Sequence, residues 1–516
     1  MTKDNAKLAK QYQSMTALEH IFKKPDTYIG AVEEDSTTTW TYDDKENKIV
    51  YKSFNWVPGF YKCFDEALVN ARDHQVRMSL SKEKNKNLVK NIEVSCDNGA
   101  ITVMNDGNGI DIAIHPKDKK WIPEMIFMHL RTSTNYDDEE KKLVGGKNGF
   151  GIKLVFIFAE WGIVETVDHI RKLKYTQRVE NNLSLIHKPK IEKYTGKPYT
   201  KVTWFPDYER FGLSGMTDDI WSHLQKRAYD IAGVTNKSMK VKLQDEIIPI
   251  KSFEQYVDMY IGEKEEVKRL YQNNERWECV IALSPLDEFS QVSFVNGINT
   301  GKGGKHVDYI IGQIIRKLAD YIEKKKKIKI NNSAIKEQLF LFLRCDIENP
   351  SFDSQTKDYM NTPLNKFGST CNVSDAFIEK IAKLGVMDRA CNISEAKDQK
   401  LAKKTDGAKT KNVRGISNFI DANYSGGTNS KDCILILCEG LSAMSGIVSG
   451  LSADDRNTIG IYPLKGKLLN VRGEQLKRIS ENKEINDIKK IMGLESGKVY
   501  ESLKDVHTSL RYGKIM

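Results

Sequence analysis

The sequence predicts an α+β protein built from several domains. Its 516 residues exceed what one hydrophobic core supports, and usual domain sizes imply roughly three or four domains. Helical and strand patterns are mixed through residues 1–245 and again through 250–395. The apolar run Cys433–Cys438 then indicates a buried strand that opens a third α/β unit.

The composition is that of a soluble intracellular protein. Apolar residues make up 40% of the chain and charged residues 29%, and no apolar run approaches the roughly 18 residues of a membrane span. The N-terminus has no hydrophobic signal core, and none of the eight cysteines forms a C-x-x-C pair. The formal net charge of +10 permits a polyanionic partner without requiring one.

The first region contains one clear helix, expected at about Gly59–Val76. Its apolar face carries Phe64, Ala67, Leu68 and Ala71. Alternating runs at 91–96 and 100–104 then predict two strands joined by a turn at 97–99.

Glu66, Asn70 and Asp73 form a polar stripe on the opposite face of this helix, at i, i+4 and i+7. A carboxylate beside a carboxamide could activate a water while the amide oxygen holds a metal ion, and phosphate hydrolysis needs both. A solvated polar face has the same pattern, so the helix alone leaves both readings open.

Two glycine-containing segments follow. Asn105–Ile110 comes directly after a strand, where Asp106 could accept a hydrogen bond from an exocyclic amine, or the segment could be an ordinary turn. Gly145–Lys153 begins with four glycines in seven residues and leads into an apolar run. Bare N–H groups before a helix suit a phosphate chain, although a flexible turn shares this composition, and the spacing fits no standard nucleotide fingerprint.

The second region and its continuation carry further polar elements. Thr200–Trp204 predicts a strand with hydroxyl side chains, and Ser354–Lys357 offers an amide and an ammonium. Strands are expected near 278–284 and 291–295, followed by a long helix at 306–325. The polar composition of 396–430 is typical of a linker.

Four motifs in this order resemble the type IIA DNA topoisomerases, specifically the eukaryotic type II enzyme, of which large DNA viruses carry close relatives. The motifs are LEHIFKKPDTYIG (18–30), FDEALVNARDH (64–74), RTSTNYDDEEKK (131–142) and FDSQTK (352–357). The resemblance covers nearly all of the chain. It implies a GHKL ATP-binding domain with an N-terminal arm (1–245), a ribosomal-S5-like transducer domain (246–395), a linker (396–430) and an incomplete α/β TOPRIM domain (431–516).

The resemblance also implies roles for individual residues. Glu66 is the expected general base, Asn70 the ligand of Mg²⁺, and Lys357 the cation that reaches the γ-phosphate together with Gln355. Asp106 and Thr200 are expected to contact adenine, and Tyr28 to cross to the partner subunit's nucleotide. The remaining nucleotide contacts are expected from the ribose side and from the glycine-rich lid: Ser133, Thr134, Asn135, Lys147, Asn148, Gly149, Gly151 and Lys153. His74 stands where the family often has asparagine.

In the third region the motif Cys438–Ala443 resembles the start of a TOPRIM domain, in which Glu439 binds a catalytic Mg²⁺. Leu441 stands where the family usually has aspartate, and the chain ends after Leu510–Met516, before the acidic D-x-D-x-D-G motif. The missing cleavage region is expected from the rest of the same polypeptide or from a second subunit, and the sequence leaves both open.

The function implied is the ATP-hydrolysing gate of a type II DNA topoisomerase. ATP and Mg²⁺ are the expected cofactors, and double-stranded DNA and a second copy of the chain are the expected partners, with no membrane. Lys324–Lys327 and Lys329 are expected to contact DNA phosphates, although a helix end also favours cations. The chain alone is expected to show ATPase activity only. The location is intracellular: the nucleus for a cellular enzyme, the host cell or virion for a viral one. The alternative is a GHKL-type conformational clamp that does not cleave DNA.

Overall fold

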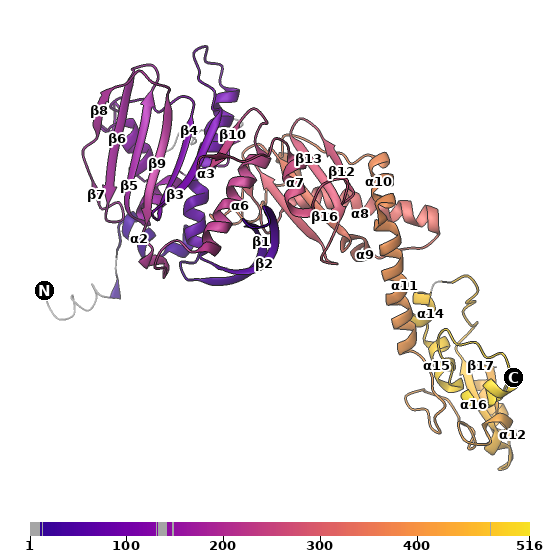
Figure 1. Ribbon diagram of the computed structural model, residues 1–516. Helices are drawn as coiled ribbons and strands as arrows, with labels where there is room; N and C mark the ends of the chain where they lie inside the picture. The colour runs from indigo at the N-terminus through magenta and orange to yellow at the C-terminus, as the bar shows by residue number, and fades with distance from the viewer. Residues whose placement is uncertain (1–10, 13, 131, 133–141, 147–148, 475) are drawn as a thin grey trace. The chain divides into compact units, whose positions relative to one another are not determined.

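The computed structural model describes residues 11–12, 14–130, 132, 142–146, 149–474 and 476–516 (Figure 1). The chain divides into two compact units, Met1–Met387 and Asp388–Met516. The finer boundaries expected at residues 245, 395 and 430 stay predictions. Among the described residues, no helix has the length and apolar character needed to cross a membrane.

The first unit begins with a nine-stranded sheet of order β11-β10-β3-β4-β9-β5-β6-β7, with β8 paired to β6. Its neighbouring strands are antiparallel except for β10 and β3, which are parallel. The strands are β3 (Asn91–Asp97), β4 (Ala100–Asp106), β5 (Ala159–Asp168), β6 (Leu173–Glu180), β7 (Leu185–Ile186), β8 (Lys190–Lys193), β9 (Tyr199–Pro206), β10 (Lys240–Leu243) and β11 (Glu246–Ile247).

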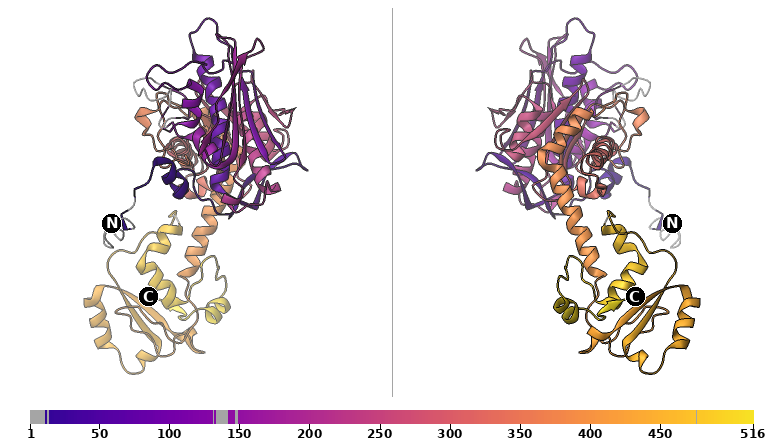
Figure 2. Two further views of the ribbon diagram at one scale, coloured as in Figure 1. Left: turned by 90° about the vertical axis from the view of Figure 1, so that its left-hand side faces the viewer. Right: turned by 90° about the vertical axis from the view of Figure 1, so that its right-hand side faces the viewer.

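Helices cover one face of this sheet, as Figures 1 and 2 show. The long helix α3 fulfils the helix expected at 59–76 and runs further at both ends. A separate antiparallel ribbon of two strands packs against α6. These elements are α2 (Ala17–Lys23), α3 (Pro58–Leu80), α4 (Ile122–Met128), α5 (Gly151–Ile157), α6 (Asp218–Val234), α7 (Phe253–Ile261), β1 (Asp35–Asp43) and β2 (Lys48–Trp56).

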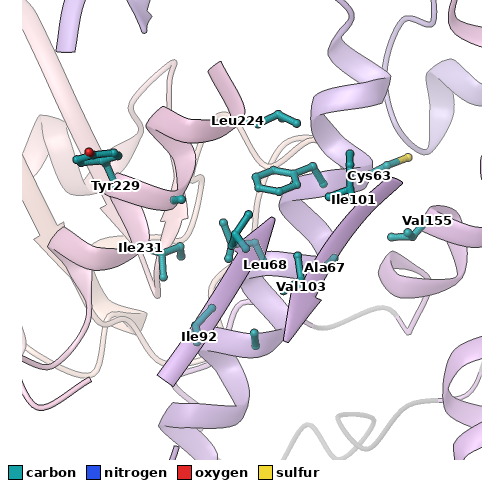
Figure 3. Packing of buried hydrophobic residues seen from close by; sticks show 14 of the residues in the cluster. Cys63, Ala67, Leu68, Ile92, Ile101, Val103, Val155, Leu224, Tyr229 and Ile231 are labelled. Atoms are coloured by element: carbon teal, nitrogen blue, oxygen red, sulfur yellow. The ribbon is translucent and has the colours of Figure 1, made fainter. Parts of the chain in front are cut away.

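The core of this region lies between α3 and the sheet (Figure 3). Leu68 of α3 is fully buried, and Ile92 of β3 and Val103 of β4 pack in the same cluster. The apolar stripe of α3 therefore faces the sheet. The remaining side of the helix is left for polar groups, and this side carries the site.

A second sheet in the first unit has the order β12-β13-β16-β14-β15, with only β14 and β16 parallel. Its Phe294 and Phe342 belong to the same hydrophobic cluster as the first sheet, so one continuous core joins the two regions. The strands and helices here are β12 (Arg269–Asn273), β13 (Trp277–Leu283), β14 (Ser290–Val295), β15 (Ile298–Asn299), β16 (Leu339–Cys345), α8 (Lys305–Lys326), α9 (Asn332–Lys336) and α10 (Asp375–Ile381).

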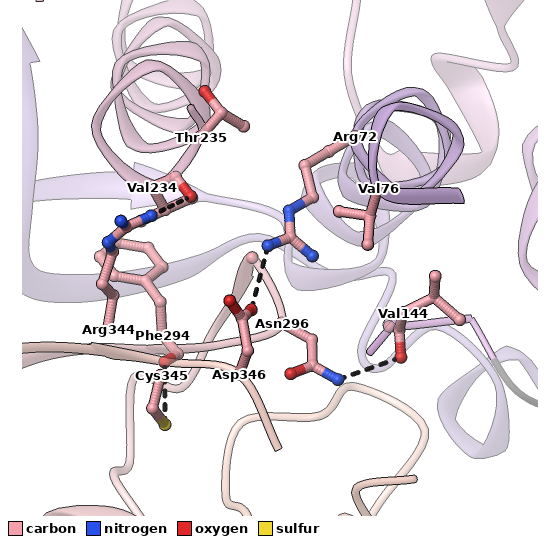
Figure 4. A network of polar contacts seen from close by, with 12 residues as sticks. Arg72, Val76, Val144, Val234, Thr235, Phe294, Asn296, Arg344, Cys345 and Asp346 are labelled. Atoms are coloured by element: carbon pink, nitrogen blue, oxygen red, sulfur yellow. Dashed lines mark hydrogen bonds and ion pairs between the residues drawn. The ribbon is translucent and has the colours of Figure 1, made fainter. Parts of the chain in front are cut away.

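Polar contacts fasten the second sheet to α3, α6 and the glycine-rich segment (Figure 4). Arg72 donates from Nη2 to Asp346 Oδ1 at 3.2 Å, and Arg344 donates to the Val234 carbonyl at 2.8 Å. Asn296 Nδ2 donates to the Val144 carbonyl at 3.3 Å. These contacts fix the second sheet against the elements that carry the site.

The second unit contains a parallel three-stranded sheet of order β18-β17-β19. Its central strand β17 matches the strand expected from the apolar run at 433–438. The elements are α11 (Met387–Lys404), which begins at the division, β17 (Ile434–Glu439), α12 (Gly440–Gly450), α13 (Asp455–Thr458), β18 (Ile459–Leu464), α14 (Leu476–Glu481), α15 (Lys483–Met492), α16 (Leu503–Ser509) and β19 (Lys514–Ile515).

The stretch 396–430 differs from the polar connector that its composition indicates. It begins with the last part of α11, and Ala422 further on is buried in the core of the second unit. Asp421 accepts hydrogen bonds from Arg511 and Tyr512. A few buried and ion-paired residues therefore hold this polar segment in the fold, and average composition does not reveal them.

Candidate functional site

A cavity of about 420 Å³ opens between α3, α5, the first sheet and the loop that carries residues 354–357. Its volume lies within the range of small-molecule sites. The structure brings together eight of the residues expected from the sequence to form a site: Glu66, Asn70, Gly149, Gly151, Lys153, Thr200, Gln355 and Lys357.

Glu66 places a buried carboxylate in the wall of the cavity, and two lysines contact it. Lys357 donates from Nζ to Glu66 Oε1 at 3.0 Å, and Lys62 Nζ lies 2.8 Å from the same oxygen. Burial would raise the pKa of the Glu66 carboxyl, but Lys357 and Lys62 together hold this pKa below its usual value. Glu66 is therefore ionised at neutral pH, as a proton acceptor must be.

The start of α5 closes the cavity against Glu66. A Cβ at Gly151 would lie 1.8 Å from Glu66 Oε2, so any side chain at this position would displace the Glu66 carboxylate. The ammonium of Lys153 donates to the Thr132 and Gly149 carbonyls, each at 2.7 Å, and burial lowers the pKa of Lys153 to about 8. Lys153 thus ties the two ends of the segment 132–149 together and keeps a positive charge at neutral pH.

Asp73, the third polar residue of the α3 stripe, holds the base of the glycine-rich segment. Its carboxylate accepts from the Gly145 N–H at 2.9 Å and from the Gly146 N–H at 2.8 Å. The stripe therefore faces the cavity and the glycine-rich segment, and it is not a solvated face of the helix. Glu66 and Asn70 line the cavity, and Asp73 anchors the loop beside it.

The structure places Asp106 beside the cavity wall, away from the lining. Its carboxylate accepts from the Lys90 N–H at 2.6 Å and from the Asn91 N–H at 2.9 Å, and Asp106 does not line the cavity. Asn105 lines it instead, as does Val103 on the same face of β4. Side chains alternate along a strand, so the residue before Asp106 points to the site.

Two further residues belong to this end of the cavity, and one of them, Thr166, is not evident from the sequence. Thr166 and Thr200 share a hydrogen bond between their hydroxyls at 2.9 Å, and Thr166 also accepts from the Ile110 N–H. His74 lines the cavity and donates from Nε2 to the Asn108 carbonyl at 2.7 Å. Burial lowers the pKa of His74 to about 4, so the ring is neutral at pH 7. The pairing of β5 with β9 locates Thr166, because it places Thr166 directly opposite Thr200.

The other expected residues fall elsewhere. Tyr28 does not line the cavity; its hydroxyl contacts His20 Nδ1 at 3.0 Å, and its ring packs against Phe150. Glu439 lies in the second unit, exposed at the start of α12. Five of the expected residues lie outside the described part of the chain: Ser133, Thr134, Asn135, Lys147 and Asn148.

The donor set of the cavity suits one kind of metal ion. Within the described ranges, no three His, Cys, Asp or Glu side chains gather to form a metal site. Mg²⁺ does not need such a cage, because it is usually held by one or two protein oxygens together with phosphate oxygens and waters. The amide oxygen of Asn70 and the carboxylate of Glu66 fit that requirement.

Comparison with known proteins places this fold. The family model of DNA gyrase B matches residues 252–409. DNA topoisomerase 2 of Saccharomyces cerevisiae is 41% identical over all of this chain and 37% of its own length. The crystal structure of the ATPase region of that yeast enzyme is 42% identical, with a TM-score of 0.70, covering 75% of this chain and all of the yeast one.

A second solved structure agrees. The ATPase and transducer domains of DNA topoisomerase II from Balamuthia mandrillaris are 36% identical, with a TM-score of 0.70, covering 76% of this chain and 99% of that one. The fold places the first unit in the class of ATPase and transducer regions of type II DNA topoisomerases. The chain belongs to the type II DNA topoisomerase family. It spans 37% of the length of the yeast relative.

These matches confirm the expected fold class for the first unit, because the mixed helices and sheets correspond to the ATPase and transducer structures. The expected TOPRIM character of the second unit stays a prediction.

Proposed function

We propose that the chain binds ATP in the 420 Å³ cavity and hydrolyses it, and that this cycle operates the DNA gate of a type II topoisomerase. The observation that carries the proposal is the ion pair between Glu66 and Lys357. A buried carboxylate and a buried ammonium, 291 positions apart, meet at 3.0 Å in the wall of a cavity that a helix start closes. A base, a cation for the developing charge and a helix N-terminus are the groups that phosphoryl transfer needs.

Each group has a defined task in the proposed reaction. Glu66 accepts the proton of the attacking water. Lys357 leaves Glu66 and neutralises charge that develops on the γ-phosphate, with Gln355 beside it. Lys153 and the N–H groups at Gly149 and Gly151 lie along the phosphates. Asn105 and Thr200 bind the base, in place of the Asp106 contact expected from the sequence.

Asn70 holds Mg²⁺ through its amide oxygen. The ion neutralises charge on the phosphate oxygens when it is bound. The protein's part is to place this oxygen one helical turn beyond Glu66, so that metal ligand and base face the same cavity.

The proposed partners are double-stranded DNA and a second copy of the chain. The exposed lysines 324–327 and 329 at the end of α8 contact DNA phosphates. The second unit is of the TOPRIM type, and Glu439 would hold Mg²⁺ there. We place the protein with genomic DNA, in the nucleus if it is cellular and in the host cell or virion if it is viral.

Phosphate release with and without duplex DNA tests the proposal. We expect ATP hydrolysis that DNA stimulates, with stimulation that weakens as salt rises. We also expect a non-hydrolysable ATP analogue to shift the chain from monomer to dimer in sedimentation experiments. A chain that does not hydrolyse ATP, or whose rate no duplex changes, contradicts the proposal.

A further inference from the structure

Lys62 is an unusual residue for the interior of a helix. It lies one turn before Glu66 on α3 and is 3% exposed, although lysine is seldom buried without a partner. Its Nζ is 2.8 Å from Glu66 Oε1 and 3.2 Å from Asp65 Oδ2. The burial of its charge is explained by these two carboxylates.

Lys62 and Lys357 share one oxygen of Glu66 but differ in what they can reach. Lys357 sits on a loop, with a backbone φ of 64°, and lines the cavity. Lys62 belongs to α3 and is not among the residues that line the cavity. Lys357 can therefore turn toward a phosphate, whereas Lys62 stays with the carboxylate.

A buried ion-pair network that includes its partner Asp65 holds Lys62 in position. Asp65 accepts from Arg227 Nε of α6 at 2.7 Å, and Arg227 in turn donates from Nη2 to the Gly297 carbonyl at 2.8 Å. Arg227 is fully buried. The chain of contacts thus runs from the cavity through α3 and α6 to the turn between β14 and β15.

We propose that Lys62 is a positioning residue: it holds the Glu66 carboxylate in place and balances its charge after Lys357 transfers to the nucleotide. The inference rests on the proposed ATP hydrolysis. Once Lys357 has left, Lys62 is the cation that the described structure leaves within 3 Å of Glu66 Oε1. Without Lys62, the carboxylate would remain buried with no partner at that moment, and it would move or take up a proton.

The test compares three variants of the full 516-residue chain. Lys62→Met removes the charge and keeps the length, and Lys62→Arg restores the charge. Lys226→Met is the matched control, because Lys226 is equally buried on α6 and pairs with Asp230 at 3.0 Å without contacting Glu66. The measured quantities are kcat, KM and the dissociation constant of a non-hydrolysable ATP analogue.

We expect Lys62→Met to lower kcat about 100-fold, since a misplaced catalytic group costs that much. Its analogue affinity stays within about threefold of wild type, because the groups that bind the nucleotide are unchanged. Lys62→Arg recovers most of the rate, and Lys226→Met keeps it. An unchanged kcat in Lys62→Met, or an equal loss in Lys226→Met, overturns the inference.

Two further experiments cover the cases in which a variant does not fold or the wild-type chain does not hydrolyse ATP. If Lys62→Met does not fold, Lys62→Gln, which keeps a donor but no charge, takes its place. If the wild-type chain itself does not hydrolyse ATP, the proposed function falls. The inference is then decided by crystal structures of the variants. A Glu66 carboxylate displaced in the Lys62 variant but not in Lys226→Met supports it, and an unmoved carboxylate overturns it.

Discussion

The ammonium of Lys357 lies 3.0 Å from the carboxylate of Glu66, and this pair joins the helix α3 to a loop 291 positions further along the chain. In the proposed function, a nucleotide phosphate that enters the cavity would compete with Glu66 for Lys357. Nucleotide binding and release of the Glu66 carboxylate would then be coupled in one exchange of partners, and the residues around Glu66 would decide whether the carboxylate stays in place.

Gly151→Ala should abolish most of the turnover. The new Cβ would lie 1.8 Å from Glu66 Oε2, so the carboxylate must shift, and a shift of this order costs about 100-fold in kcat. The control is Gly312→Ala in α8, where a Cβ meets open space and alanine favours the helix by up to about 1 kcal/mol. Equal rates in both variants would show that Glu66 has room to move.

The affinity for nucleotide should fall as pH rises above about 8. Burial lowers the pKa of Lys153 to about 8, so its charge is present below that pH and lost above it. The dissociation constant of an ATP analogue measured between pH 7 and 9.5 checks this. Lys153→Arg keeps its charge throughout, so its affinity should stay level; a parallel decline in both proteins would exclude Lys153 as the cause.

The sequence predicts the elements of this site better than their exact partners. Helix α3 and the strands β3 and β4 follow from hydrophobic periodicity, and the stripe of Glu66 and Asn70 follows from helical spacing. Lys62 lies four residues before Glu66 on the same stripe, so helical spacing also predicts that Lys62 lies next to Glu66. The approach of Lys357 has no local signal, because a contact across 291 positions depends on how the sheets pack.

Asp106 shows a different limit. Asn105 and Asp106 are adjacent polar residues at the end of β4. The alternation of side chains along the strand decides which of the two faces the cavity. Residues 396–430 show a third limit, because Asp421 pairs with the fully buried Arg511, and composition counts Asp421 only as one more polar residue.

Acid should destabilise the first unit between about pH 6.5 and 4. Burial lowers the pKa of His223 and of His306 to about 3, below the usual 6.5, so both rings are neutral when folded and take up protons on unfolding. Stability is therefore complete above pH 6.5 and falls by about 1.4 kcal/mol per pH unit for each histidine below it.

His223→Phe checks this prediction, because the ring of residue 223 is packed among Phe54, Trp56 and Tyr61. The variant should lose one histidine's share of the slope in urea unfolding measured across pH 4.5–7.5. The same slope in variant and wild type would mean that His223 does not titrate on unfolding.

Asp421→Asn should destabilise the second unit by about 3 kcal/mol, because it leaves the fully buried Arg511 without its carboxylate. Hydrogen exchange of the β17 amides in the full chain reports the change. Asp454→Asn, at an exposed position, should alter exchange little. Equal protection in the two variants would argue that the Asp421–Arg511 pair does not hold this unit together.

The most direct test of the account is steady-state phosphate release by the wild-type chain and by Glu66→Gln, with analogue binding measured beside it. Glutamine keeps the shape of the side chain and removes only the proton acceptor, so we predict normal or tighter binding and a loss of at least 100-fold in kcat. Undiminished hydrolysis by Glu66→Gln would contradict the role of Glu66 and, with it, the mechanism built around its pair with Lys357.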